Sequence, residues 1–234
     1  MSPVHRDQLL RTRAGQWDDL RSMLLAYADH SPVRRVAVVG NAPLEPDPVR
    51  AAEIDAADLV IRANAMVLDD RGDLPTVGTR CHVVLLSRRT RLTPWALRDY
   101  RDRLYLVPQA GFVEYHPGDE VGLLLETPFW PEDLGAVPLP NAVVKARAVQ
   151  ALDPGAAPGA VIPTTGTMGV FMAHEMFPEA EVVIAGFSFL DDVAQTHWDH
   201  HSGARVKLNT RHQLDLEARL LHRWIDDGTV RRLS

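Results

Sequence analysis

The sequence predicts a single α/β domain in which helices cover both faces of a mostly parallel, twisted sheet. Short apolar runs rich in β-branched residues, typical of buried parallel strands, recur along the 234 residues. Stretches with a helical spacing of apolar residues separate these runs, and strands that alternate with helices form parallel sheets. A chain of this length forms one such domain more often than two.

The chain begins with a helical segment. From Asp7 to about Ala28, apolar residues such as Leu20 and Leu24 recur mostly at three- and four-residue intervals, which predicts an amphipathic helix or helix pair. We therefore expect an N-terminal helical segment, residues 1–31, packed on the body of an α/β domain, residues 32–234.

The first expected strand lies in RRVAVVGN, residues 34–41, and its β-branched run ends at Gly40, which favours a tight turn. Further strands are expected at residues 59–64, 82–87, 103–108 and 182–187, and helices at residues 48–57, 94–102, 141–152, 167–177 and 211–226. This alternation is that of a Rossmann-like domain. Between Pro108 and Pro140 the pattern breaks down, and a loop of this length predicts a lid or one wall of a binding site.

Composition excludes several classes of protein. A net charge of -6 disfavours a nucleic-acid binder, which needs a basic face. Cys81 is the single cysteine, so no intrachain disulfide can form, and no run of apolar residues is long enough for a membrane span. We expect a cytoplasmic protein, and the abundance of Ala, Arg, Val and Leu suits a high-GC bacterium.

Polar groups follow the first two expected strands. Gly40 permits a close backbone approach, and Asn41 offers both a donor and an acceptor. Asn64 ends the neighbouring strand and could act with Asn41 on a base or ribose. The segment lacks the G-x-G-x-x-G spacing of dinucleotide sites, and plain turn chemistry remains an alternative for both asparagines.

A second polar segment precedes an apolar helix. Thr164, Thr165, Gly166 and Thr167 form a turn towards which the free N–H groups of the helix point, an arrangement that binds phosphate. The alternative is that Thr165 or Thr167 simply caps the helix.

Histidines gather near the C-terminus. His197, Asp199, His200 and His201 could ligate a metal ion by residue type, although their spacing fits no standard zinc motif.

His212 stands near the start of the last expected helix. Asp215 or Glu217 could orient its imidazole for general-base catalysis. The alternative is an ordinary surface helix start.

Taken in order, these segments resemble the sialyltransferases of glycosyltransferase family twenty-nine. VAVVGN, IDAADLVIRANAM and VGTR are similar to the family's large motif, and PTTGTMGVFMAHEMFPEAEVVIAGF is similar to its small motif. HWDH resembles the His-Tyr-Tyr motif, and HQLDLE matches the final His-x-x-x-x-Glu motif. These blocks span residues 36–217.

The resemblance implies a GT-A-like variant of the Rossmann-like fold and an inverting glycosyltransferase. Its donor would be a CMP-activated, sialic acid-like sugar, its acceptor a hydroxyl group, and it would use no metal or other cofactor. We expect a small-molecule acceptor, because nothing in the sequence suggests docking to a membrane or a large glycoprotein. Asn41 and Asn64 would contact the nucleotide, with Thr165 and Gly166 lining the ribose and phosphate pocket. His197 would assist the leaving phosphate, and His212 would deprotonate the acceptor.

The sequence also departs from the family. Arg35 stands where the family has a cysteine, so its disulfide between the large and small motifs is absent. Trp198 and Asp199 replace the two tyrosines of the aromatic motif, so nucleotide recognition is the firmer implication and sialyl transfer the weaker one. Three alternatives follow: a hydrolase of a cytidine nucleotide or CMP-sugar, a non-catalytic nucleotide-binding protein of the same fold, and a metal hydrolase.

Overall fold

The computed structural model describes residues 3–63, 65–87, 92–107, 133–139, 141–157 and 160–234. Its centre is a seven-stranded sheet in the order β5-β4-β3-β2-β1-β6-β9. Every neighbouring pair is parallel. The strands are β1 (Arg35–Val39), β2 (Leu59–Ala63), β3 (Val83–Leu85), β4 (Leu104–Val107), β5 (Val137–Pro138), β6 (Glu181–Ala185) and β9 (Val230–Arg232).

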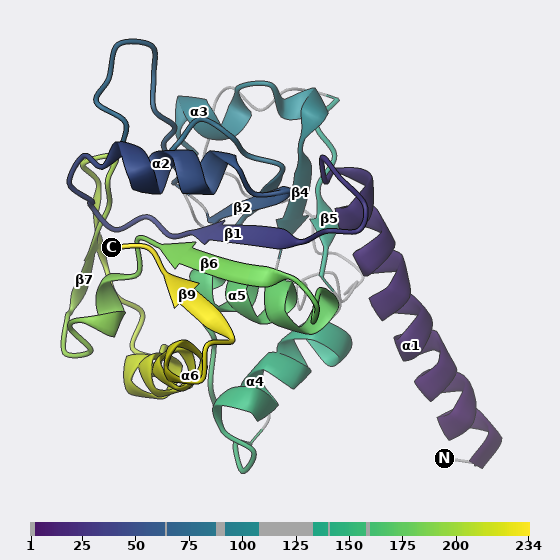
Figure 1. Cartoon of the computed structure of the whole chain (residues 1–234). Helices are drawn as coiled ribbons and strands as arrows, with labels where there is room; N and C mark the ends of the chain where they lie inside the picture. The colour runs from purple at the N-terminus through teal and green to yellow at the C-terminus, as the bar shows by residue number, and fades with distance from the viewer. Residues whose placement is uncertain (1–2, 64, 88–91, 108–132, 140, 158–159) are drawn as a thin grey trace.

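Helices cover both faces of this sheet (Figure 1). The helices are α1 (Pro3–Ala26), α2 (Pro48–Asp55), α3 (Pro94–Leu97), α4 (Ala146–Leu152), α5 (Thr165–Met176) and α6 (Leu214–Asp226), with the short turns η1 (Tyr100–Asp102), η3 (Asn141–Lys145) and η4 (Ser188–Leu190). A separate antiparallel hairpin pairs β7 (His197–Asp199) with β8 (Arg205–Lys207). The predicted α/β, Rossmann-like fold is confirmed.

Alternate residues of the central strands pack on opposite faces of the sheet. In β1, Val36 and Val38 pack in the same cluster as α5 and α6, whereas Ala37 and Val39 pack with Ile54 of α2 on the opposite face. This alternation is the period of two that a strand imposes on its side chains. Both sets are apolar because helices cover both faces of the sheet at β1.

Helix α1 runs away from the body along much of its length (Figure 1). Its last turns carry Leu20 and Leu24, which are fully buried in the cluster that also contains the sheet residues Val36 and Val38. The Arg21 side chain donates a hydrogen bond to the carbonyl oxygen of Met176 at 2.8 Å. The division into residues 1–31 and 32–234 stays a prediction, but this end of α1 belongs to the main core.

The structure differs from the expected elements at their ends. Helix α5 begins at Thr165, two residues before the predicted start, because Thr164 caps it by accepting a hydrogen bond from the Thr167 N–H. Strands β5, β7, β8 and β9 were not predicted, since each has only two or three residues. Most of the predicted lid, residues 108–140, lies outside the described residues. Within the described part of the chain, no helix has the length and apolarity that crossing a membrane requires.

Candidate functional site

The order of the strands fixes where a ligand site is expected. The chain leaves β1 towards β2 on one side, and β6 lies on the other side of β1, so the carboxyl ends of β1 and β6 form the switch point of the sheet. The loops after these two strands are joined by hydrogen bonds from Gly40 N–H to the Ala185 oxygen, 2.8 Å, and from Ala42 N–H to the Gly186 oxygen, 3.1 Å.

Gly40 makes this junction possible. A Cβ atom at position 40 would lie 2.2 Å from the carbonyl oxygen of Gly186, so no other residue fits without moving the backbone. Gly186 in turn has a φ of +74°, a conformation that favours glycine. The close approach expected of Gly40 is therefore made to another loop of the protein.

The tip of the β7–β8 hairpin is fastened to the loop after β1. The His201 N–H donates to the Asn41 carbonyl oxygen at 2.7 Å, and the Leu44 N–H donates to Nδ1 of His201 at 3.3 Å. The side-chain oxygen Oδ1 of Asn41 is buried without a hydrogen-bond partner among the described residues. A buried acceptor of this kind is usually satisfied by a ligand or water.

The first turn of α5 lies at the same edge of the sheet, because α5 runs back along the sheet to the start of β6. Thr165 and Gly166 form this turn and are partly exposed. A Cβ at Gly166 would lie 2.8 Å from the ring of Phe187, the residue that follows Gly186. The first turn thus sits against the loop after β6, where its N–H groups favour an anion.

The buried carboxylate of Glu217 joins α6 to the start of α5. Its side chain is completely buried and accepts hydrogen bonds from the Thr164 N–H at 3.1 Å, from the Thr164 hydroxyl at 2.6 Å and from the Thr167 hydroxyl. Burial raises the pKa of Glu217 to about 7, although the bonds from Thr164 and Thr167 act in the opposite direction. The two threonine hydroxyls therefore hold the helices together.

His212 lies beside this junction. Its Nδ1 is 2.7 Å from the carbonyl oxygen of Ile162, which precedes the turn of α5. Because a carbonyl oxygen only accepts, Nδ1 carries the hydrogen and Nε2 of the neutral ring has a free lone pair. Burial lowers the pKa of His212, and the bond to Ile162 offsets this only in part. The imidazole is thereby fixed in the form that accepts a proton.

The expectation that Asp215 or Glu217 orients His212 is wrong. Asp215 forms an ion pair with Arg219 at 3.1 Å, and Glu217 faces the threonines of α5. The reason is that α6 begins at Leu214, so His212 precedes the helix, whereas Glu217 lies on its buried face. Sequence spacing cannot reveal a main-chain partner such as Ile162, so this contact was missed.

His197 stands in β7, where its Nδ1 is 2.9 Å from the hydroxyl of Thr196. The neighbouring His200 has a buried Nδ1 without a partner in the described structure, and burial lowers its pKa. No group of three His, Cys, Asp or Glu side chains within the described ranges is arranged to hold a metal ion. The predicted metal independence stays a prediction.

The structure thus brings Gly40, Asn41, Thr164, Thr165, Gly166, Thr167 and His212 to the carboxyl edge of the sheet around β1 and β6. His197 belongs to the hairpin whose tip contacts Asn41. Asn64 lies outside the described residues. The roles proposed for these residues are untested by the geometry alone.

Comparison with known proteins points to one class of fold. No family model matches the chain, and no curated protein matches it in sequence. Two solved structures of a mammalian sialyltransferase are similar, each 17% identical and each aligned over 86% of this chain and 69% of the other. The TM-score is 0.49 for the first and 0.52 for the second, which is the complex with Gal-beta-1-3GalNAc-ortho-nitrophenol. The second comparison shows that this chain has a sialyltransferase-like fold.

Proposed function

We propose that the protein is an inverting glycosyltransferase that uses a CMP-activated, sialic acid-like donor and transfers its sugar to a hydroxyl group. The observation that carries the proposal is the fixed tautomer of His212, whose Nε2 is free to accept a proton at the carboxyl edge of the sheet. The sialyltransferase-like fold and the motifs in the sequence supply the donor class.

In the proposed reaction, Nε2 of His212 takes the proton of the acceptor hydroxyl. The acceptor oxygen forms a bond to the anomeric carbon of the donor from the face opposite the phosphate. The bond between that carbon and the phosphate oxygen breaks, its electron pair stays on the phosphate, and CMP leaves. The lowered pKa of His212 keeps the ring neutral before the reaction, which is the form that this step needs.

The leaving phosphate requires stabilisation of its growing charge. The partly exposed Thr165 and Gly166 open α5, so their N–H groups and the helix dipole are suited to a phosphate oxygen. Thr164 and Thr167 act indirectly, because their hydroxyls bind Glu217 and hold the turn. We assign to His197 the assistance of the leaving phosphate. We assign the contacts with the nucleotide to Asn41 and Asn64. With these donors the reaction needs no metal.

The acceptor is proposed to be a sugar or another small polyol. One similar structure is a sialyltransferase in complex with Gal-beta-1-3GalNAc-ortho-nitrophenol, which supports a sugar hydroxyl as the nucleophile. We further propose that the protein acts in the cytoplasm of a bacterium.

Calorimetric titration of CMP, UMP, GMP and AMP into the full chain, with and without the Asn41→Ala change, tests the nucleotide. We expect CMP to bind at least tenfold more tightly than the others and the Asn41→Ala change to weaken it. Equal affinity for all four nucleotides would contradict the proposed CMP-activated donor.

Turnover of CMP-sialic acid with a panel of acceptors then tests the reaction class. Transfer that persists in excess chelator supports a metal-independent transferase. Release of free sugar at the same rate with and without acceptors would instead favour the hydrolase.

A further inference from the structure

A pocket of about 350 Å³ lies at the amino edge of the sheet, opposite the candidate site. Its lining residues come from three segments: Tyr27 after α1, residues between 100 and 105 at the start of β4, and residues 133–135 before β5. Strands β4 and β5 lie next to the end of α1 in Figure 1. Because the strands are parallel, this edge lies across the sheet from the carboxyl ends near Asn41 and His212. The pocket is therefore separate from the candidate site.

Three tyrosines line this pocket. Tyr105 is fully buried, and its hydroxyl donates a hydrogen bond to the carbonyl oxygen of Ala96 at 2.5 Å, so this side chain is fixed. Tyr27 and Tyr100 are only partly buried. Their rings can therefore offer a flat apolar surface to the ring of a ligand.

A polar triad of Tyr100, Arg101 and Asp133 joins the segment before β4 to the segment before β5. The Tyr100 hydroxyl donates to Oδ1 of Asp133 at 2.6 Å, and Nη2 of Arg101 donates to Oδ2 at 2.9 Å. These two hydrogen bonds lower the pKa of Asp133, so its carboxylate is ionised and the charge of Arg101 balances it. The guanidinium of Arg101 lies over the Tyr100 ring, 5.5 Å from its centre. Within the described ranges, Nε and Nη1 of Arg101 donate no hydrogen bond and are available to a ligand.

Arg103 adds a positive charge that no carboxylate lining the pocket balances. Its side chain is buried, and Nη1 donates to the carbonyl oxygen of Trp95 at 2.6 Å. In the described structure its ion-pair partner is Asp99, 3.9 Å away and 67% exposed, so water screens this carboxylate. Two arginines and one aspartate thus line the pocket, and the excess positive charge favours an anion.

The size of the pocket suits one ring with a small charged group. Ligand pockets span roughly 300–1,000 Å³, and the volume of about 350 Å³ lies near the lower end of this range. Gly135 stands in its wall, and a Cβ atom at this position would meet no other group within 4 Å. A larger residue at position 135 can therefore fill this space without moving the backbone.

We propose that this pocket is a second ligand site for a small aromatic anion, whose planar ring packs on Tyr27 and Tyr100 and whose anionic group binds Arg101. A carboxylate and a phosphate share the chemistry that Arg101 recognises. This inference goes beyond the proposed function, since the pocket lies across the sheet from the residues assigned to sugar transfer.

Saturation-transfer NMR on the full chain tests the ligand class with benzoate, phenyl phosphate, the neutral benzamide and the ringless acetate. We expect benzoate or phenyl phosphate to bind about tenfold more tightly than benzamide, because only an anion pairs with Arg101. The same ligand should bind about tenfold more tightly than acetate, which has no ring to pack on the tyrosines. The tighter of benzoate and phenyl phosphate identifies the anionic group. Equal affinity for benzamide and for both anions would overturn the proposal.

Two variants test the place of binding. Arg101→Gln should weaken binding of the aromatic anion about tenfold by removing its charged partner, and Gly135→Leu should weaken it at least as much by filling the pocket. The matched controls are Arg98→Gln, which removes an exposed arginine that pairs with Asp70 outside the pocket, and Gly155→Leu at an exposed glycine. Both controls should bind as the wild type does. Unchanged binding in both Arg101→Gln and Gly135→Leu would overturn the assignment to this pocket.

Calorimetry with CMP on the wild type and Gly135→Leu separates this inference from the proposed function. The CMP dissociation constant should stay the same in Gly135→Leu, because the nucleotide is proposed to bind at the other edge of the sheet. A clear loss of CMP affinity in this variant would place the nucleotide in this pocket and overturn the second site. Selective CMP binding by a wild-type protein that binds no aromatic anion of the panel would overturn this inference alone. Binding of the aromatic anion without CMP binding would overturn the proposed function and leave this pocket.

Discussion

Two regions at the same edge of the sheet differ in whether their buried polar groups have hydrogen-bond partners. At the junction of α5 and α6, the Glu217 carboxylate is bound by Thr164 and Thr167, and the His212 ring is bound by Ile162. At the hairpin and the loop it contacts, buried side-chain atoms have no hydrogen-bond partner in the described structure: Asn41 Oδ1, Gln195 Nε2, His200 Nδ1 and Ser202 Oγ.

The difference separates two kinds of region. We call the junction of α5 and α6 the platform, and we call the hairpin and the loop it contacts the recognition surface. Satisfied buried networks are rigid, so the junction suits groups that must be held for catalysis, such as His212 and the first turn of α5. Unsatisfied groups cost stability in the free protein and gain a partner when a polar ligand binds. Changes at the junction should therefore affect rate or folding, and changes at the hairpin should affect binding.

The largest effect is expected at His212. His212→Gln removes the base, so kcat/KM should fall by about 10²–10⁴ while CMP affinity stays nearly constant. His222→Gln is the matched control, because His222 also bonds a carbonyl oxygen, that of Leu190 at 3.0 Å, but lies exposed on α6.

The pH profile sharpens the same test. A histidine with a lowered pKa stays neutral below its ordinary value of 6.5, so the acid limb of kcat/KM should lie below pH 6.5. A limb at or above that pH would contradict the assignment of His212 as base.

The second-largest effect is a dependence of protein stability on pH that comes from Glu217. The pKa of Glu217 is raised from 4.5 to about 7, so the folded protein keeps this proton while the unfolded chain releases it. The stabilisation that the protonated Glu217 gives the folded state is therefore fully present below pH 4.5 and is lost as the pH rises through about 7. This loss lowers the free energy of unfolding by about 3 kcal/mol.

Urea unfolding of wild type and Glu217→Gln at several pH values measures this difference. The variant should lack the decline, whereas the exposed Glu179→Gln change should preserve it. If the free energy of unfolding depended on pH in the same way for Glu217→Gln and wild type, the Glu217 carboxyl would have its ordinary pKa in the folded protein.

Asn41 tests the recognition surface. Asn41→Ala removes the unpartnered Oδ1, so CMP affinity should fall about tenfold, while the free energy of unfolding should change by less than about 0.5 kcal/mol. Calorimetry and urea unfolding measure the two quantities. A large loss of stability without a loss of affinity would place Asn41 with the platform.

The smallest effect is expected at Ser202. Replacing a buried hydroxyl that lacks a partner with a methyl group should leave the free protein as stable as before or more stable by up to about 1 kcal/mol. Thermal unfolding of Ser202→Ala without ligand gives the answer. A clear decrease in stability would mean that the hydroxyl already has a partner in solution.

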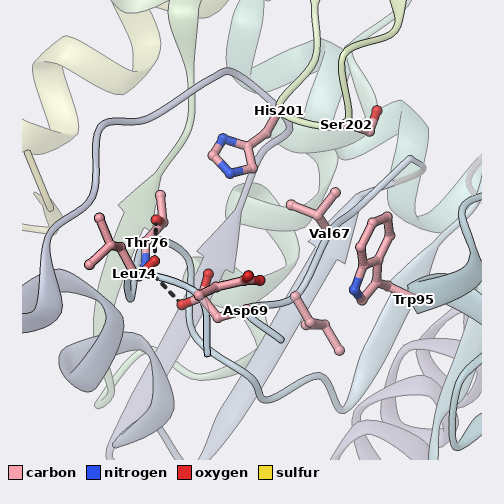
Figure 2. Close-up of a pocket in the computed structure, with 9 residues that line it drawn as sticks. Val67, Asp69, Leu74, Thr76, Trp95, His201 and Ser202 are labelled. Atoms are coloured by element: carbon pink, nitrogen blue, oxygen red, sulfur yellow. Dashed lines mark hydrogen bonds between the residues drawn. The ribbon is translucent and has the colours of Figure 1, made fainter. Parts of the chain in front are cut away.

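Parts of the site followed directly from the order of residues. The turn before α5 was predicted because a run of threonine and glycine before an apolar helix is typical of a helix cap or of a phosphate site at the helix N-terminus. The tautomer of His212 could not be predicted, since its partner is the main chain of Ile162, fifty residues away. The pocket that Thr76, Trp95 and His201 help to line (Figure 2) was also missed, because its walls come from segments far apart in the sequence.

The sequence by itself determined the sheet, because apolar β-branched runs separated by helical periods can bury their faces only in a layered α/β fold. It also indicated Asn41, the threonine turn and His212 as candidate site residues. Only the tertiary structure decided which of these polar groups are satisfied. Hydrogen bonding depends on distances between segments, as between Glu217 and Thr164, and local sequence patterns carry no information about such distances.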